Sequence, residues 1–122
     1  MDIKELRIGN KVYYNSNNKS IGVVTSIRGG FVQENGVLLD NRIKPVIPIS
    51  KIRPIEINEN ILNFHGFKKI SPVHYILTLD SRITIEINIS ESCDYSWIND
   101  HPIKKIRYVH ELQNILYTFG IK

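Results

Sequence analysis

The sequence contains no alanine, a single cysteine and no apolar run of the length that a membrane span needs. Because a spanning helix takes about 20 apolar residues, we expect no membrane partner. The single Cys93 excludes an internal disulfide and a cysteine-rich zinc site. The charged start, Met1–Glu5, is not followed by an apolar stretch, which argues against a secretory signal. We therefore expect a cytoplasmic protein.

Isoleucine and asparagine are abundant, with 22 and 12 of the 122 residues. Alanine is the best helix former and isoleucine favours strands, so this composition predicts a chain rich in β-structure. Apolar residues make up 42% and charged residues 23%, as in ordinary globular domains, which argues against a disordered chain. The net charge of +4 is a mild basic excess, weaker than the concentrated charge typical of nucleic-acid-binding domains.

The first half of the chain alternates short apolar segments with turn formers. Strands are expected at residues 11–14, 21–27, 31–33 and from residue 37 onward. Three prolines interrupt residues 43–57, so this segment is expected to be an edge strand or an extended connector. Several short strands followed by an extended exit predict an SH3-like small β-barrel over residues 1–57.

The second half combines helical and strand patterns. Asn58 can cap a short helix over residues 58–65. Apolar residues then alternate with polar ones over residues 75–79 and 83–89, which predicts an antiparallel hairpin. Residues 90–100 are polar and are expected to form a loop.

The C-terminal segment has helical periodicity. Val109, Leu112, Leu116 and Phe119 form one apolar stripe, which predicts an amphipathic helix over residues 108–119. The predicted fold class is therefore α+β. An SH3-like module over residues 1–57 is followed by an α+β module over residues 58–122, the two packed as one unit.

Several short segments resemble small uncharacterised proteins of phages and mobile elements in Bacteroidetes. The resemblance is carried by Leu6–Asn10, Arg53–Ile55, Gly66–Phe67 and Tyr108–Asn114. It implies a short accessory protein of a mobile element. Such proteins often bind and block host components, including defence systems. The resemblance implies no activity, because a shared fold or pattern does not specify chemistry.

No residue pattern points to catalysis, a metal or a cofactor. Cys93 lies between acidic residues, whereas a reactive thiol needs an electropositive setting. The histidines at positions 65, 74, 101 and 110 show neither of the short spacings that place two imidazoles on one metal ion. We therefore expect a non-enzymatic protein with no catalytic residues, no metal site and no cofactor.

Two groups of residues are candidates for contact with a host or phage protein. Tyr95 and Trp97 are aromatic residues in a polar segment, and exposed aromatics often anchor interfaces. His110, Gln113 and Asn114 can form a polar patch on the last helix. The alternative for this second group is structural, since polar side chains at a helix surface often tie it to a neighbouring element.

Basic residues suggest a second function, the binding of nucleic acid. The candidates lie along the proline-rich exit of the predicted barrel and just before the last helix: Arg42, Lys44, Lys51, Arg53, Lys104, Lys105 and Arg107. Tyr13, Tyr14 and Phe31 could stack on bases, although aromatics in small barrels more often belong to the core. A third alternative is a sponge for a small ligand or nucleotide. Homo-oligomerisation is left open.

Overall fold

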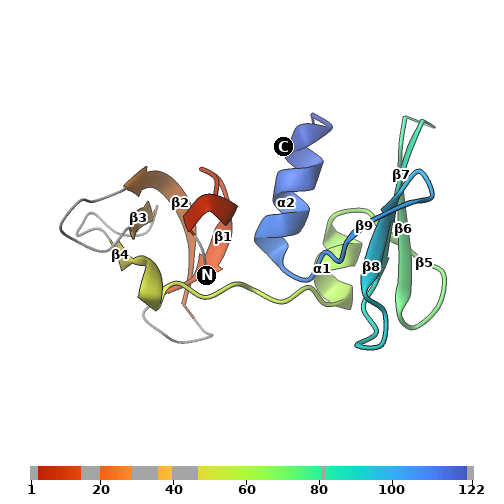
Figure 1. Cartoon of the computed structure of the whole chain (residues 1–122), viewed down its shortest axis with the longest axis horizontal. Coiled ribbons are helices and arrows are strands. Elements are labelled where there is room, and N and C mark those ends of the chain that lie inside the picture. Colours follow the sequence, from red (N-terminus) through yellow and green to blue (C-terminus); the bar gives the residue numbers. More distant parts are fainter. Residues whose placement is uncertain (1–2, 15–19, 29–35, 40–46, 81, 121–122) are drawn as a thin grey trace. The chain divides into compact units, whose positions relative to one another are not determined.

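The computed structural model describes residues 3–14, 20–28, 36–39, 47–80 and 82–120, and it divides the chain into two compact units (Figure 1). Unit 1 comprises Met1–Glu56 together with Tyr108–Lys122, and unit 2 comprises Ile57–Arg107. The fold class is α+β, as predicted. Unit 2 is inserted into unit 1 along the chain. The predicted division placed the C-terminal helix with residues 58–107, whereas in the structure this helix groups with the N-terminal strands.

Unit 1 contains a four-stranded antiparallel sheet and two 3₁₀ turns. Its strands follow the chain order β1-β2-β3-β4, and the turns are η1 (Ile3–Glu5) and η2 (Ile49–Lys51). The strands are β1 (Lys11–Tyr13), β2 (Ile21–Arg28), β3 (Gly36–Leu39) and β4 (Ile47–Pro48). The strands predicted near residues 11, 21 and 37 are confirmed, whereas the predicted strand at 31–33 lies outside the described residues.

The chain returns to β1 after η2. Tyr13 and Arg53 exchange two backbone hydrogen bonds, of 2.9 and 3.0 Å. Among the described residues the strands form no closed barrel. The core of this sheet consists of buried apolar side chains from every strand and from both flanking segments: Leu6, Val12, Val24, Leu39, Ile47 and Ile52. Tyr14 packs against this core, in line with the structural alternative for the barrel aromatics.

The C-terminal helix α2 (Val109–Thr118) also belongs to unit 1. The predicted stripe is confirmed for Val109, Leu112 and Leu116, which are buried. The helix begins where the Glu111 side chain accepts a hydrogen bond from the Tyr108 amide, at 3.1 Å. Gly120 follows the helix with a φ of +82°, a conformation that glycine adopts without strain.

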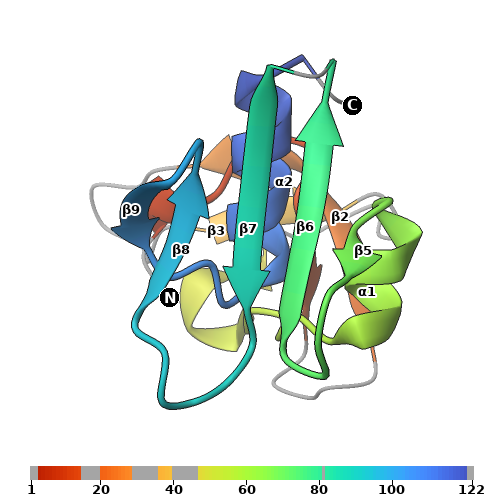
Figure 2. The ribbon, with the colours of Figure 1, turned by 90° about the vertical axis from the view of Figure 1, so that its right-hand side faces the viewer.

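Unit 2 contains a five-stranded antiparallel sheet in the order β5-β6-β7-β8-β9 (Figure 2). The strands are β5 (Lys68–Lys69), β6 (His74–Leu79), β7 (Ile83–Asn88), β8 (Tyr95–Ile98) and β9 (His101–Lys104). The predicted hairpin is confirmed as β6 and β7, paired from His74↔Asn88 to Leu79↔Ile83.

The predicted short helix is α1 (Glu59–Phe64), and it also belongs to unit 2. The Asn58 side chain accepts a hydrogen bond from the Ile61 amide at 3.0 Å, as an N-cap does. Lys69 and Glu59 form an exposed ion pair of 2.8 Å that joins β5 to α1. The hydrogen bond to Glu59 and its charge raise the pKa of Lys69 above its ordinary value.

The prediction of a loop over residues 90–100 is wrong for the second half of this segment. Residues Tyr95–Ile98 form β8, which pairs with β7 on one side and with β9 on the other. The strand pattern is easy to miss because one of its two inward side chains is Ser96, which is fully buried. The Ser96 hydroxyl accepts a hydrogen bond from the Ile106 amide at 3.0 Å, so its burial leaves no polar atom unsatisfied.

Candidate functional site

One face of the unit 2 sheet is buried and the other is exposed to varying degrees. On the buried face, Tyr75, Ile85 and Ile87 are fully inaccessible to solvent. Because side chains alternate along a strand, the pairing register assigns the neighbouring positions to the opposite face. We call this opposite face the exposed face. It comprises Lys68, His74, Ile76, Thr78, Thr84, Glu86, Asn88, Tyr95, Trp97, Pro102 and Lys104.

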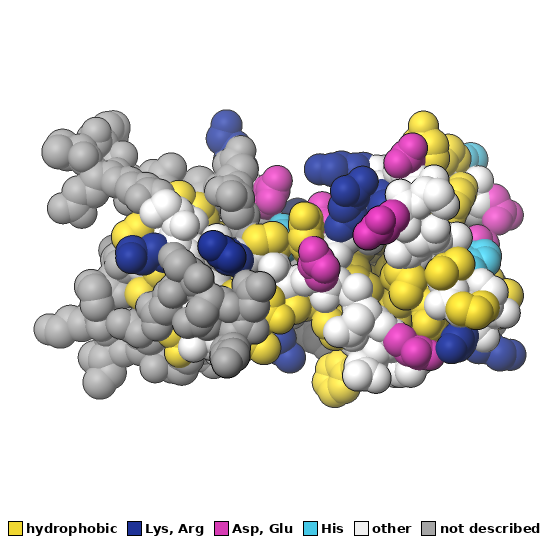
Figure 3. Space-filling view, turned by 90° about the horizontal axis from the view of Figure 1, so that it is seen from below, with side chains coloured by type: hydrophobic (Ala, Val, Ile, Leu, Met, Phe, Trp, Pro, Cys, Tyr) yellow, Lys and Arg dark blue, Asp and Glu magenta, His cyan; other side chains and the backbone are white. Residues whose placement is uncertain are grey.

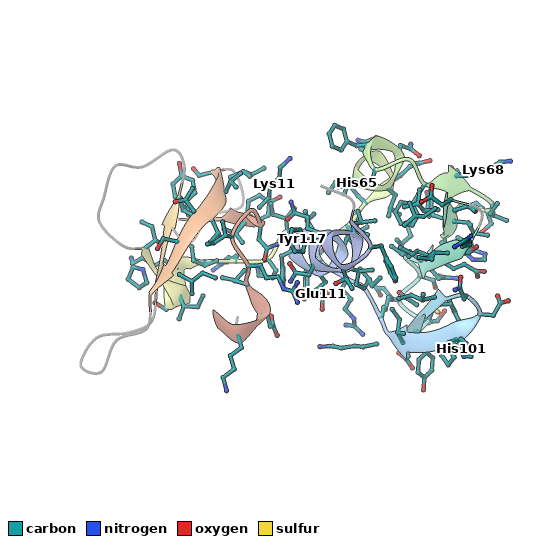
Figure 4. The ribbon with its side chains drawn as sticks, turned by 90° about the horizontal axis from the view of Figure 1, so that it is seen from above. Lys11, His65, Lys68, His101, Glu111 and Tyr117 are labelled. Atoms are coloured by element: carbon teal, nitrogen blue, oxygen red, sulfur yellow. The ribbon has the colours of Figure 1, made fainter. Side chains whose placement is uncertain are left out.

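A single row of paired residues crosses the exposed face from one edge of the sheet to the other. The row runs through all five strands in the order Lys68, Ile76, Glu86, Trp97 and Pro102. Directly opposed side chains in such a row have Cβ atoms about 5 Å apart. Figure 4 labels Lys68 of β5 and His101 of β9, which mark the two edge strands. The row therefore brings an aliphatic, an acidic and an aromatic side chain together at the centre of the face.

Tyr95 and Trp97 project from β8 onto this exposed face. Tyr95 is 55% exposed and Trp97 is half-buried. Two residues apart on one strand, their Cα atoms are separated by about 7 Å. The predicted pair of aromatic contact residues therefore shares one surface, with Glu86 and Pro102 beside Trp97 in the row and Ile76 beyond Glu86. Sequence analysis did not identify Ile76, Glu86 or Pro102, because their place in the row depends on strand pairing.

The β8–β9 turn fixes the position of this aromatic strand. Asn99 and Asp100 both have positive φ, of 50° and 66°, as in the tightest two-residue hairpin turns. The Asn99 amide donates to the Thr84 carbonyl at 2.9 Å, and the Thr84 amide donates to Asn99 Oδ1 at 2.8 Å. The turn is thus attached to the start of β7 at two points.

Replacement of Asn99 by alanine is expected to lower the free energy of unfolding by about 1–2 kcal/mol, because it removes the bond to Thr84 and places a methyl group at positive φ. Urea unfolding followed by the fluorescence of Trp97, the single tryptophan, measures the loss. Asn99→Gly is the control, since glycine keeps the backbone unstrained and loses only the side-chain bond. Equal stability of Asn99→Ala and the wild type would contradict this account of the turn.

Glu86 is the acidic residue at the centre of the row. Its Oε2 lies 3.2 Å from His74 Nε2, and the side chains of Glu86 and His74 are 21% and 30% exposed. Both groups lie on the exposed face, on neighbouring strands. The centre of this face therefore carries a half-buried carboxylate beside apolar and aromatic surface.

The second predicted contact group, on α2, makes hydrogen bonds within unit 1. Gln113 Oε1 accepts from the Lys11 amide at 2.9 Å, and Gln113 Nε2 donates to the Gly9 carbonyl at 3.2 Å. Asn114 Oδ1 accepts from Asn10 Nδ2, and Asn114 Nδ2 donates to the Glu5 carbonyl, both at 2.9 Å. In Figure 4, Lys11 marks β1, and Glu111 and Tyr117 mark α2. This is the structural role that sequence analysis kept as the alternative for these two residues.

His110, the third member of that group, is 1% exposed. It lies one position beyond the apolar stripe, yet it is buried, with Glu5 of η1 beside it. Its Nε2 lies 3.5 Å from Glu5 Oε2, and its ring stacks on that of Tyr108 at 5.9 Å with an interplanar angle of 8°. In this conformation His110 presents almost no surface to a partner.

The basic candidates are divided between the two units. Lys51 and Arg53 are exposed in unit 1, and Lys104 and Arg107 are exposed in unit 2. Lys105 Nζ donates to the Ser90 carbonyl at 2.6 Å. Arg42, Lys44 and the aromatic Phe31 lie outside the described residues. Seen from below, basic side chains lie interspersed with acidic and apolar ones (Figure 3).

The described residues bring together no group of three or more histidine, cysteine, aspartate or glutamate side chains that could hold a metal ion. Cys93 is half-buried, and its Sγ lies 3.3 Å from the Tyr95 carbonyl oxygen. This contact places the thiol at the start of β8, beside the exposed face.

Neither of the described helices is long and apolar enough to cross a membrane. The comparisons with known proteins add no relative: no family model, curated protein or solved structure matches the chain.

Proposed function

We propose that this chain is a non-enzymatic protein that acts by binding a protein partner through the exposed face of the unit 2 sheet. The observation that carries the proposal is the position of Trp97 and Tyr95. Both aromatic side chains lie on one solvent-facing sheet surface. Pro102 extends the apolar surface on the β9 side of Trp97, and Ile76 lies on the other side, beyond Glu86.

The composition of this face is that of a protein interface. Interface centres are rich in aromatic residues and are surrounded by polar ones, and tryptophan and tyrosine often account for most of the binding energy. Here Ile76 and Trp97 lie on β6 and β8, the strands on either side of the central strand β7. Lys68 and Lys104 lie on the two edge strands. The attachment of the β8–β9 turn to Thr84 keeps the aromatic strand in place before binding, which reduces the entropic cost of association.

The resemblance to accessory proteins of Bacteroidetes phages and mobile elements supports a biological context for this proposal. A short cytoplasmic protein that occupies a host protein, such as a component of a defence system, needs shape and hydrogen bonding but no cofactor. The exposed face offers both a shape for a partner to cover and side chains that form hydrogen bonds.

The test is capture of partners from a Bacteroidetes lysate, followed by affinity measurement with the purified partner. Trp97→Ala is expected to weaken binding about 30-fold or more, the loss typical of an interface hot spot. Tyr117→Ala is the matched control, because Tyr117 is a 62% exposed aromatic residue on α2. Circular dichroism checks that both variants stay folded. A partner that binds Trp97→Ala as tightly as the wild type would overturn the proposal.

The same affinity measurement, repeated at several salt concentrations, distinguishes protein binding from the alternative of nucleic-acid binding. Binding through Lys51, Arg53, Lys104, Lys105 and Arg107 to phosphates would fall steeply with salt. Binding to the exposed face depends on apolar contact, which salt weakens little. A steep salt dependence, together with loss of binding in Arg53→Ala and Arg107→Ala, would favour nucleic acid.

We propose further that unit 1 has an SH3-like topology. The support is the order of its strands, in which β1 to β4 follow the chain and η2 leads to Arg53, which pairs with Tyr13 of β1. A final segment that returns to the first strand is the way in which small antiparallel barrels join their two edges.

A further inference from the structure

The exposed face carries a carboxylate at its centre, where a protein interface usually carries none. Among the residues that define this face, Glu86 is the single acidic side chain, and it is only 21% exposed. Charged residues are depleted at interface centres because removing a charge from water is costly unless the charge is paired. A partner that covers Glu86 must therefore supply a compensating group.

The bond to His74 does not use all of the hydrogen-bonding capacity of this carboxylate. A carboxylate has about four acceptor positions, and within the described residues the Glu86 carboxylate is in contact with His74, through its Oε2 and His74 Nε2 at 3.2 Å. The other oxygen, Oε1, lies on the same half-exposed group. Because the Glu86 side chain is 21% exposed, part of this capacity is accessible to a donor from outside the chain.

Trp97 stands directly opposite Glu86 on the neighbouring strand. The face of an indole ring attracts cations, and a cation can lie over the ring and contact a neighbouring carboxylate at the same time. A guanidinium suits both contacts better than an ammonium, because it is planar, stacks on aromatic rings and binds carboxylates through two parallel hydrogen bonds.

We propose that the exposed face binds an arginine side chain of its protein partner, with the guanidinium stacked on Trp97 and paired with Glu86. This inference rests on the proposed function, and it names the chemistry of the partner. The two lysines of the face do not oppose it strongly. Lys68 lies two strands from Glu86, about 10 Å away across the sheet. Lys104 lies on the edge strand β9. At physiological salt, exposed charges at such separations are largely screened.

The single tryptophan makes this site directly observable, since tryptophan emission, excited selectively over that of the six tyrosines, reports Trp97 alone. The probes are blocked tripeptides Gly-Arg-Gly, Gly-Leu-Gly and Gly-Glu-Gly, titrated at millimolar concentration into the full chain. The arginine peptide is expected to change the fluorescence saturably, and the leucine and glutamate peptides are not. Glu86→Gln, which keeps the size of the side chain, is expected to weaken binding of the arginine peptide about tenfold.

Two controls make the result specific. Thr78→Val changes an exposed position on the same face away from the row, and it is expected to leave the affinity for the arginine peptide unchanged. Circular dichroism shows whether Glu86→Gln stays folded. Equal binding of the glutamate peptide, no response to the arginine peptide, or unchanged affinity in Glu86→Gln would overturn the inference.

The captured partner separates failure of this inference from failure of the proposed function. If Trp97→Ala weakens partner binding and Glu86→Gln does not, the face binds a protein but not through an arginine. If neither substitution weakens partner binding, the proposed function fails as well. If both substitutions weaken partner binding and one arginine of the partner is required, both proposals are supported.

Discussion

Replacing Ile85 by alanine is expected to lower the free energy of unfolding by about 3 kcal/mol, within the range of 2–5 kcal/mol measured for such truncations in cores. Ile85 is fully buried in the centre of β7, opposite Leu77 of β6 and Ile98 of β8. The truncation removes apolar contacts and leaves a cavity between strands that are paired on both sides. Urea unfolding followed by Trp97 fluorescence measures the loss, because Trp97 lies on the neighbouring strand.

Ile76→Ala is the matched control for this substitution. Ile76 lies on β6, on the exposed face of the same sheet, and it is only half-buried. The same deletion of side-chain atoms is therefore expected to cost about 1 kcal/mol. If the two variants lose equal stability, or if Ile76→Ala loses more, the assignment of the buried and exposed faces is wrong.

The alternation in residues 75–89 was sufficient to predict this hairpin, because a period of two directly reports one buried and one exposed face. The helix α2 was predictable for a similar reason, since its apolar stripe repeats with the helical period. Both signals are local. Each needs only the side chains of one segment, and the structure confirms both elements.

β8 and the exposed face were not predictable in this way. Tyr95–Ile98 is four residues long, and its buried positions hold a serine and an isoleucine, so its apolar pattern is too weak to distinguish a strand from a loop. Its pairing with Glu86 depends on an antiparallel register that no local signal reports. The sequence singled out Tyr95 and Trp97 as candidate contact residues, but it could not supply their neighbours.

The joint between α2 and the N-terminal segment shows the same limit. Asn10 and Asn114 are separated by 104 positions in the chain, and they form a direct side-chain hydrogen bond. From the sequence, Gln113 and Asn114 are equally suited to meet a partner or to bond within the chain. The segments Leu6–Asn10 and Tyr108–Asn114 meet at this joint. The hydrogen bonds between them give these polar residues a structural role that is independent of any partner.

Asn114→Ala is expected to lower the free energy of unfolding by about 2–3 kcal/mol, because it removes two hydrogen bonds and leaves a buried donor without its acceptor. That donor is Asn10 Nδ2, on a residue that is 2% exposed, whereas the bond to the Glu5 carbonyl lies at an exposed position. Urea unfolding followed by circular dichroism measures the loss. Thr118→Ala is the control, since the Thr118 hydroxyl donates to the Asn114 carbonyl at an exposed position, and its loss is expected to cost well under 1 kcal/mol.

A double-mutant cycle shows whether the cost arises from the pair itself. Asn10 also accepts a hydrogen bond from the Arg7 amide at 2.7 Å, so Asn10→Ala alone is expected to be costly. With both residues replaced by alanine, neither side-chain amide of the Asn10–Asn114 pair is left without the other, and the double variant should lose about 1 kcal/mol less than the sum of the single losses. Strictly additive losses would show that Asn10 and Asn114 act independently. In that case the two side chains would not form the joint that holds α2 to the N-terminal segment.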